Sequence, residues 1–186
     1  EKPTGALNPK SVGAAIGALM PENAIVSAEL TTSGGPIFGA TRGAVPHDWL
    51  SLTGGSIGQA IPVATGAAVA CPDRKVICIQ SDGGGMYTNQ ALWTHARESL
   101  DIVTVILTNR RYKILEHEYF KTGANELGPK AESLFDIGNP DIDWAHLAKG
   151  MGMEGHRAET AEDFTAKLEA ALAADGPQLI DAVYSG

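Results

Sequence analysis

The chain has 186 residues, of which 44% are hydrophobic and 19% are charged, a size and composition typical of one α/β domain with a real core rather than two domains. Its net charge of −8 and its pI near 5.0 argue against nucleic acid or an anionic membrane surface as a partner. No apolar run approaches the roughly 18 residues of a membrane span, and the N-terminus lacks a secretory pattern. We therefore expect a cytoplasmic protein.

The N-terminal part of the chain predicts helices that alternate with short strands. Asn8 before Pro9 is typical of a helix start, and Pro21 ends that helix. Further along we expect a strand over 24–27, a polar loop over 29–35, a strand over 49–52, a glycine loop over 53–58 and a helix over 59–70. The hydroxyls of the first loop, and the N–H groups that follow the second, are suited to phosphate oxygens.

The remainder of the chain continues the alternation. Strands are expected over 76–80, 102–107, 154–156 and 179–183; helices over 88–99, 143–149 and 161–174; irregular or loop structure over 113–130 and 131–140. Repeated alternation predicts an α/β fold, a doubly wound and mostly parallel sheet with helices on both faces. We assign residues 1–186 to a single domain, and because the chain opens at Glu1 without methionine we expect it to be part of a longer protein.

The stretch from Val76 to Tyr112 carries the chemistry. Its two strands and the helix between them form a βαβ unit, so both strands end at the same edge of the sheet. Asp82 and Asn109 lie just past those ends, about 5 Å apart if the strands are neighbours. With the carbonyl of Arg111 they form a set of hard oxygens that suits Mg²⁺, while Gly83–Gly85 would offer N–H groups to a phosphate. The alternative is that Asp82 only caps a helix and Asn109 lies in a turn.

The same stretch resembles the thiamine diphosphate motif, in which the tripeptide GDG is followed at a set spacing by NN. Here Ser81-Asp82-Gly83 is followed by Asn109, with residues 84–108 between them, and this spacing fits the motif. Ser81 replaces the first glycine and Thr108 the first asparagine, and neither change removes a proposed metal ligand. From Asn8 to Val183 the chain looks like the diphosphate-binding domain of the acetolactate synthase, pyruvate decarboxylase and benzoylformate decarboxylase group, which implies the thiamine diphosphate-binding fold.

The resemblance implies a role for individual residues. Asp82, Asn109 and the Arg111 carbonyl would be the metal ligands, and the Gly55 carbonyl would accept a hydrogen bond from the cofactor's amino group. Ile57 would wedge between the two cofactor rings and hold them bent. The full cofactor-binding set would be Thr31, Thr32, Gly55, Ser56, Ile57, Asp82, Gly83, Gly84, Asn109, Arg111, Tyr112 and Ile114.

The resemblance also bears on the substrate pocket and on one cofactor contact. Ile114 and Leu115 would line the substrate pocket, and Leu115 stands where pyruvate decarboxylases carry a catalytic acid, which argues against simple acetaldehyde chemistry. Gly84 replaces a serine found in some relatives, which weakens one expected diphosphate contact.

The resemblance also implies an activity and partners. It predicts the C-terminal part of a 2-oxo acid decarboxylase or carboligase that uses thiamine diphosphate and Mg²⁺, with FAD dependence and the choice of 2-oxo acid left open. The activating glutamate would belong to a pyrimidine-binding domain of the same or a neighbouring subunit in a homodimer or homotetramer. Glu29 falls in the phosphate loop on the wrong side, so no catalytic residue is assigned here and the domain alone would be inactive.

Two other interpretations stay open. One is a free-standing diphosphate-binding subunit of a two-chain decarboxylase. The other, from a different class, is a non-catalytic flavodoxin-like module that holds phosphate or a nucleotide.

Overall fold

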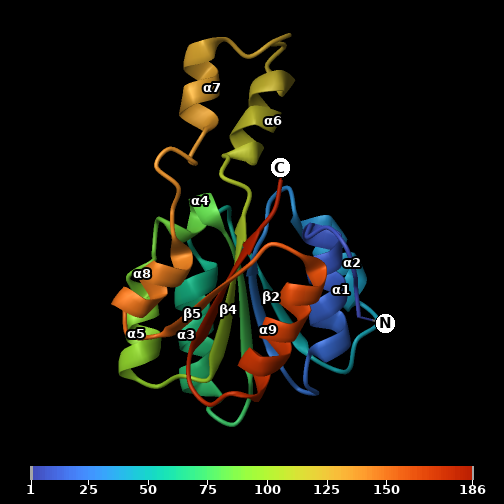
Figure 1. Cartoon of the computed structure of the whole chain (residues 1–186), viewed down its shortest axis with the longest axis vertical. Coiled ribbons are helices and arrows are strands. Elements are labelled where there is room, and N and C mark those ends of the chain that lie inside the picture. The colour runs from blue at the N-terminus through green and yellow to red at the C-terminus, as the bar shows by residue number, and fades with distance from the viewer. Residues whose placement is uncertain (1, 186) are drawn as a thin grey trace.

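The computed structural model describes residues 2–185, and these residues form a six-stranded sheet in which every neighbouring pair is parallel (Figure 1). The strand order is β2-β1-β3-β4-β6-β5. The predicted doubly wound α/β fold is therefore confirmed. The strands are β1 (Ile25–Glu29), β2 (Asp48–Ser51), β3 (Val76–Ser81), β4 (Ile102–Thr108), β5 (Glu154–Ala158) and β6 (Gln178–Val183).

Helices cover both faces of the sheet (Figure 1). One face carries α1 (Pro9–Leu19), α2 (Gly34–Thr41) and α9 (Ala161–Ala173), and the other carries α3 (Ala60–Ala70), α5 (Ala91–Arg97) and α8 (Trp144–Gly150). The short helix α4 (Asp82–Gly85) begins directly after β3. No helix within residues 2–185 combines the length and the apolar character that a membrane crossing requires.

The expected helix starts are built as predicted. The Asn8 side chain accepts hydrogen bonds from the backbone N–H groups of Lys10 and Ser11, which satisfies two donors that the helix itself leaves free. The Thr160 and Asp143 side chains cap α9 and α8 in the same way. These caps fix where the helices begin and therefore how they lie on the sheet.

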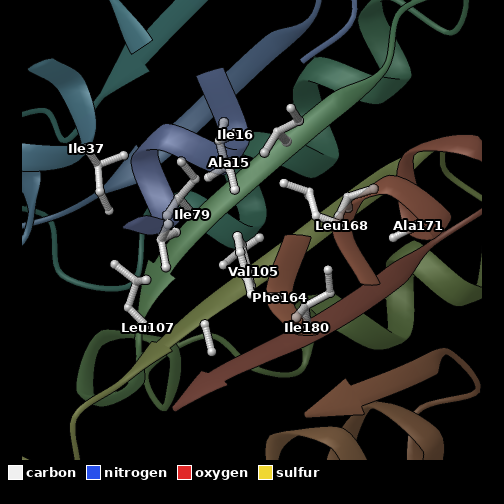
Figure 2. Packing of buried hydrophobic residues seen from close by; sticks show 14 of the residues in the cluster. Ala15, Ile16, Ile37, Ile79, Val105, Leu107, Phe164, Leu168, Ala171 and Ile180 are labelled. Carbon is white, nitrogen blue, oxygen red and sulfur yellow. The ribbon is translucent and has the colours of Figure 1, made fainter. Parts of the chain in front are cut away.

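The sheet is fixed by two apolar layers, one on each face. Every residue of β4 is buried, as is every residue of β3 except Ser81, as expected for central parallel strands. Figure 2 shows one layer, in which Ile16 of α1 and Phe164 of α9 pack over Ile79 and Val105 of the sheet. Successive side chains of a strand point to opposite faces, so packing on both faces fixes the register of the strands. The positions of the strand ends are fixed with it.

Two predictions for the region after β4 were wrong. Residues 113–130 were expected to be irregular and residues 131–140 to be a loop, but the chain forms α6 (Lys113–Lys121) and α7 (Pro129–Phe135). Figure 1 shows both helices projecting beyond the sheet edge, and we call residues 113–135 the α6–α7 arm. No residue of either helix, all of which lie within the described range, is buried. The charged residues over 113–130, and Gly138 with Pro140 in the second stretch, had led to the expectation of irregular structure.

The prediction of a polar loop over 29–35 was also only partly correct. Glu29 ends β1, and the chain enters α2 at Gly34 after a short turn. Two consecutive glycines at a helix start lower the helical propensity of the sequence, and burial of Ile37 and Thr41 against the body compensates for this.

Candidate cofactor site

Asp82 and Asn109 meet at one edge of the sheet because β3 and β4 are neighbouring parallel strands, paired in register up to Ser81 opposite Leu107. The Asp82 Oδ2 atom accepts a hydrogen bond of 2.7 Å from the backbone N–H of Arg110. The carboxylate after β3 is thus joined directly to the turn after β4. The expectation that the two strand ends share one place is confirmed.

Each of the three predicted ligand oxygens already accepts one backbone hydrogen bond. Asp82 Oδ1 accepts from Gly83 at 2.9 Å, Asn109 Oδ1 from Arg111 at 3.0 Å, and the Arg111 carbonyl from Lys113 at 2.9 Å. A carbonyl or carboxylate oxygen has a second lone pair available. These bonds therefore orient the oxygens and leave each able to accept from, or coordinate, one more group.

The Asp82 carboxyl is almost fully buried, with 3% of its surface exposed. Burial raises its pKa above the ordinary range, while the N–H groups of Gly83, Arg110 and Asn109 lower it in part. Within residues 2–185 its hydrogen-bond donors are backbone N–H groups and not cationic side chains. A carboxylate that has lost its water in this way favours a bound cation, which would restore the charged form.

Three successive glycines follow Asp82, and two of them, Gly83 and Gly84, form the floor of the site. A Cβ atom at Gly83 would lie 2.5 Å from the Tyr112 ring, and one at Gly85 would lie 2.8 Å from the Trp144 ring. A Cβ at Gly84 would collide with the Glu29 carboxylate and lie 2.5 Å from the Gln80 amide. An added Cβ would meet a close neighbour at all three positions, and the backbone of Gly83 and Gly84 lines the site.

A cavity of about 240 Å³ opens above these glycines. It brings together ten of the twelve predicted cofactor residues, all except Gly55 and Ser56, and it includes Leu115 as well. Gly55 and Ser56 lie in the exposed loop between β2 and α3, where Gly54 and Gly55 both have positive φ. Of the predicted residues, the cavity is lined by Thr31, Thr32, Ile57, Asp82, Gly83, Gly84, Asn109, Arg111, Tyr112, Ile114 and Leu115.

The two sides of this cavity differ in character. Thr31 and Thr32 follow β1 and bring hydroxyls and backbone N–H groups next to the acidic edge. Ile57, Ile114 and Leu115 supply apolar surface from the glycine loop and from the start of α6. A polar end beside an apolar end suits a ligand that carries both phosphate and aromatic parts.

Sequence reasoning missed two groups in this cavity. Glu29 was expected in the phosphate loop, but it ends β1, is 1% exposed and lines the cavity, and within residues 2–185 its Oε2 atom has no hydrogen-bond partner. Tyr184 follows β6, and its hydroxyl lies 3.1 Å from the Ser33 hydroxyl. The only sequence signal for either was its position at a strand end on the same sheet edge.

The residues present fit a magnesium-bound diphosphate. The donor set is one carboxylate, one amide and one carbonyl, the hard oxygens that Mg²⁺ takes while keeping sites for water and phosphate. The described residues contain no group of three or more His, Cys, Asp or Glu side chains of the kind that holds a metal alone. A site with one carboxylate needs ligand oxygens to complete it, and the glycine floor leaves space for them.

This arrangement defines a class of protein. The chain belongs to the family described as thiamine pyrophosphate enzyme, C-terminal TPP binding domain, which matches residues 38–182. The chain is therefore a thiamine diphosphate-binding C-terminal domain of the kind found in acetolactate synthase-like and benzoylformate decarboxylase-like enzymes.

Individual relatives extend this match over nearly the whole chain. A Mycobacterium tuberculosis protein, named provisionally as acetolactate synthase large subunit IlvX, is 51% identical over 97% of this chain and 35% of its own length. Benzoylformate decarboxylase of Pseudomonas aeruginosa is 35% identical over 95% of this chain and 32% of its own length.

A solved structure gives the same result for the fold. The thiamine diphosphate-dependent 4-hydroxybenzoylformate decarboxylase of Rhodococcus jostii RHA1 superposes with a TM-score of 0.85 at 33% identity, over 98% of this chain and 34% of that one. The chain thus spans about a third of the length of the relatives that it matches.

Proposed function

We propose that this chain is the diphosphate-binding domain of a larger enzyme that decarboxylates a 2-oxo acid, or joins it to a second carbonyl compound, with thiamine diphosphate and Mg²⁺. The observation that carries the proposal is the bond from the Arg110 N–H to Asp82, which brings the ends of β3 and β4 to one glycine-floored cavity. Names of relatives that include decarboxylases and acetolactate synthase subunits support the reaction class.

In this proposal Asp82, Asn109 and the Arg111 carbonyl hold the metal ion. Thr31 and Thr32 bind diphosphate oxygens together with the backbone of Gly83 and Gly84, because hydroxyls and N–H groups can all donate to an anion there. Gly55 and Ser56 would reach the cofactor from the exposed glycine loop. Ile57, Tyr112 and Ile114 would contact its ring portion.

The bound cofactor would supply the carbanion stabilisation that loss of CO₂ from a 2-oxo acid requires. The chain's own part is to hold the cofactor, exclude water from its apolar side and shape the substrate end with Ile114 and Leu115. Because Leu115 cannot donate a proton, this domain offers no acid at that position. The glutamate that activates the cofactor would come from a pyrimidine-binding domain, and the domain alone would be inactive.

One exposed surface supports such a partner. Helix α3 and its flanks, residues 54–72, contain no charged residue, although Pro62, Gly66, Val69 and Ala70 of the helix are exposed, Val69 by 62%. A neutral exposed helix face is unusual for a free surface. We propose that it packs against the pyrimidine-binding domain of the same or a neighbouring subunit in a homodimer or homotetramer.

Val69→Lys tests this contact. It should lower the oligomeric state of the full-length protein in sedimentation velocity, because a lysine ammonium would be buried without a partner. Ala166→Lys, exposed on α9 across the sheet, is the matched control. An unchanged oligomer in both variants would contradict a contact with a neighbouring subunit.

The other two interpretations lead to different results with the intact protein. We expect thiamine diphosphate to bind in calorimetry with Mg²⁺ present and not after chelation with EDTA, and purified protein to release CO₂ from a 2-oxo acid such as pyruvate or benzoylformate. Binding of ADP or FMN in place of thiamine diphosphate would favour the nucleotide module. Turnover that appears only after a second polypeptide is added would favour the two-chain enzyme.

A further inference from the structure

Arg110 lies between the two proposed ligands Asn109 and Arg111, and its backbone is left-handed. Its φ is +59°, a conformation that L residues with a full side chain rarely adopt and that glycine adopts freely. The same residue donates its N–H to Asp82. The turn that presents the ligands therefore depends on a backbone conformation that arginine itself disfavours.

The loop before α8 binds both the side chain and the backbone carbonyl of Arg110. The Arg110 guanidinium donates from Nε to Asp141 Oδ1 at 2.9 Å and from Nη2 to Asp141 Oδ2 at 3.0 Å, a bidentate pair. The Arg110 carbonyl accepts from the N–H of Ile137 at 3.0 Å. Gly138 lies against the arginine stem, since a Cβ there would be 3.1 Å from the Arg110 Cβ and Cδ atoms.

We propose that Asp141 is a positioning residue for the metal site: its bidentate bond to Arg110 holds that residue in the left-handed conformation, so that Asp82, Asn109 and the Arg111 carbonyl face one ion. The inference rests on the proposed function, because it assigns to this turn the task of presenting metal ligands. Asp141 itself does not line the cavity.

The exposure of the Arg110–Asp141 pair predicts which property changes when the pair is lost. Arg110 and Asp141 side chains are 35% and 38% exposed, so the bond contributes little to the stability of the fold. If it is broken, Arg110 relaxes toward negative φ, its N–H turns away from Asp82 and the flanking peptide groups rotate. The effect therefore falls on metal affinity, while the folded state remains.

The test is Mn²⁺ binding to the full-length protein with thiamine diphosphate present, followed by electron paramagnetic resonance of free Mn²⁺. Asp141→Asn should weaken Mn²⁺ binding about fivefold, which corresponds to about 1 kcal/mol. Asp48→Asn is the matched control, since it breaks a comparable surface pair with Arg74 in which the two atoms are 2.7 Å apart. That pair lies at the opposite edge of the sheet, and we expect no change in affinity.

Two substitutions at position 110 separate positioning from simple loss of an ion pair. Arg110→Ala and Arg110→Gly both remove the guanidinium, but only glycine adopts the left-handed backbone of this position without strain. Arg110→Gly should bind Mn²⁺ about fivefold more tightly than Arg110→Ala and remain close to the wild type. Equal affinities for these two variants, or wild-type affinity in Asp141→Asn, would overturn the inference.

Asp82→Ala distinguishes failure of the inference from failure of the proposed function. If Asp82→Ala abolishes Mn²⁺ binding while Arg110→Ala and Arg110→Gly bind alike, the metal site stands and the positioning role is wrong. If Asp82→Ala leaves binding unchanged, the proposed function itself is wrong. Thermal unfolding of each variant verifies that it is folded.

Discussion

The sheet edge and the α6–α7 arm contribute to the same cavity but are built in opposite ways. Asp82 follows a strand buried on both faces, whereas Ile114 and Leu115 begin a helix that buries no residue of its own within the described chain. The arm is joined at its base by the Arg111 guanidinium, which pairs with Glu116 and with Glu132 at 2.6 Å. In our proposal the cofactor anchor is thus fixed by the core, while the substrate side depends on the arm, which surface ion pairs join at its base, and on a partner.

Truncating one leucine in each region should show the largest difference. Leu168→Ala in α9, which is fully buried, should lower the free energy of unfolding by about 2–5 kcal/mol, because apolar contacts are lost and a cavity remains. Leu134→Ala in the arm, where the side chain is 72% exposed, should change it by less than about 0.5 kcal/mol. Urea unfolding of the 186-residue chain measures both. Comparable losses would show that the arm is part of the cooperative core.

A glycine substitution should give the next largest effect. Gly155→Ala should destabilise the chain by about 1–3 kcal/mol, since the new Cβ would collide with the backbone carbonyl of Ala145 where α8 packs on β5. Gly128→Ala at the start of α7 is the control, because no atom of the described chain lies within 4 Å of the added Cβ and the backbone φ is −74°. If both variants melt like the wild type, the close packing of α8 on the sheet is not required.

The pH dependence of stability that arises from Asp181, which bonds to Thr108 at the end of β4, should be a smaller effect. Its side chain is buried and accepts a hydrogen bond from Thr108, and burial raises its pKa to about 6, against smaller lowering effects from Thr108 and Arg157. A raised pKa in the folded state means that the folded chain holds this proton more tightly than the unfolded chain does. Stability therefore falls as the pH rises from about 4 through about 6.

Asp181→Asn removes this titration and keeps an oxygen for Thr108. Relative to the variant, the wild type should lose about 1–2 kcal/mol between pH 4 and pH 7 in urea unfolding. Parallel pH profiles for the two proteins would contradict a raised pKa at this position.

The sequence predicted the sheet edge well and the α6–α7 arm poorly. The apolar runs of β3 and β4 and the residues at their ends predicted the fold and the meeting of Asp82 with Asn109, because a buried parallel strand has a strong and local pattern. The arm helices bury no residue within the described chain, and the many charged residues over 113–130 made irregular structure the expectation there.

Other features depend on contacts between distant parts of the chain. Glu29 lies beside Gly84 only because β1 and β3 pair in register, with Glu29 opposite Gln80. Arg110 and Asp141 are 31 residues apart, and their pairing depends on the path of the arm and the loop after it. Composition and spacing do not encode such contacts, and the assignment of individual residues to the cofactor stays a prediction.

The most direct test of the account is the effect of Asp82→Ala on Mg²⁺-dependent binding of thiamine diphosphate to the full-length protein, measured by calorimetry. Because Asp82 is the only carboxylate proposed as a ligand, we expect the variant to show no Mg²⁺-dependent binding heat. Asp73→Ala, exposed in the turn before β3, should bind like the wild type. Unchanged affinity in Asp82→Ala would contradict the claim that the ends of β3 and β4 hold one ion and the diphosphate together.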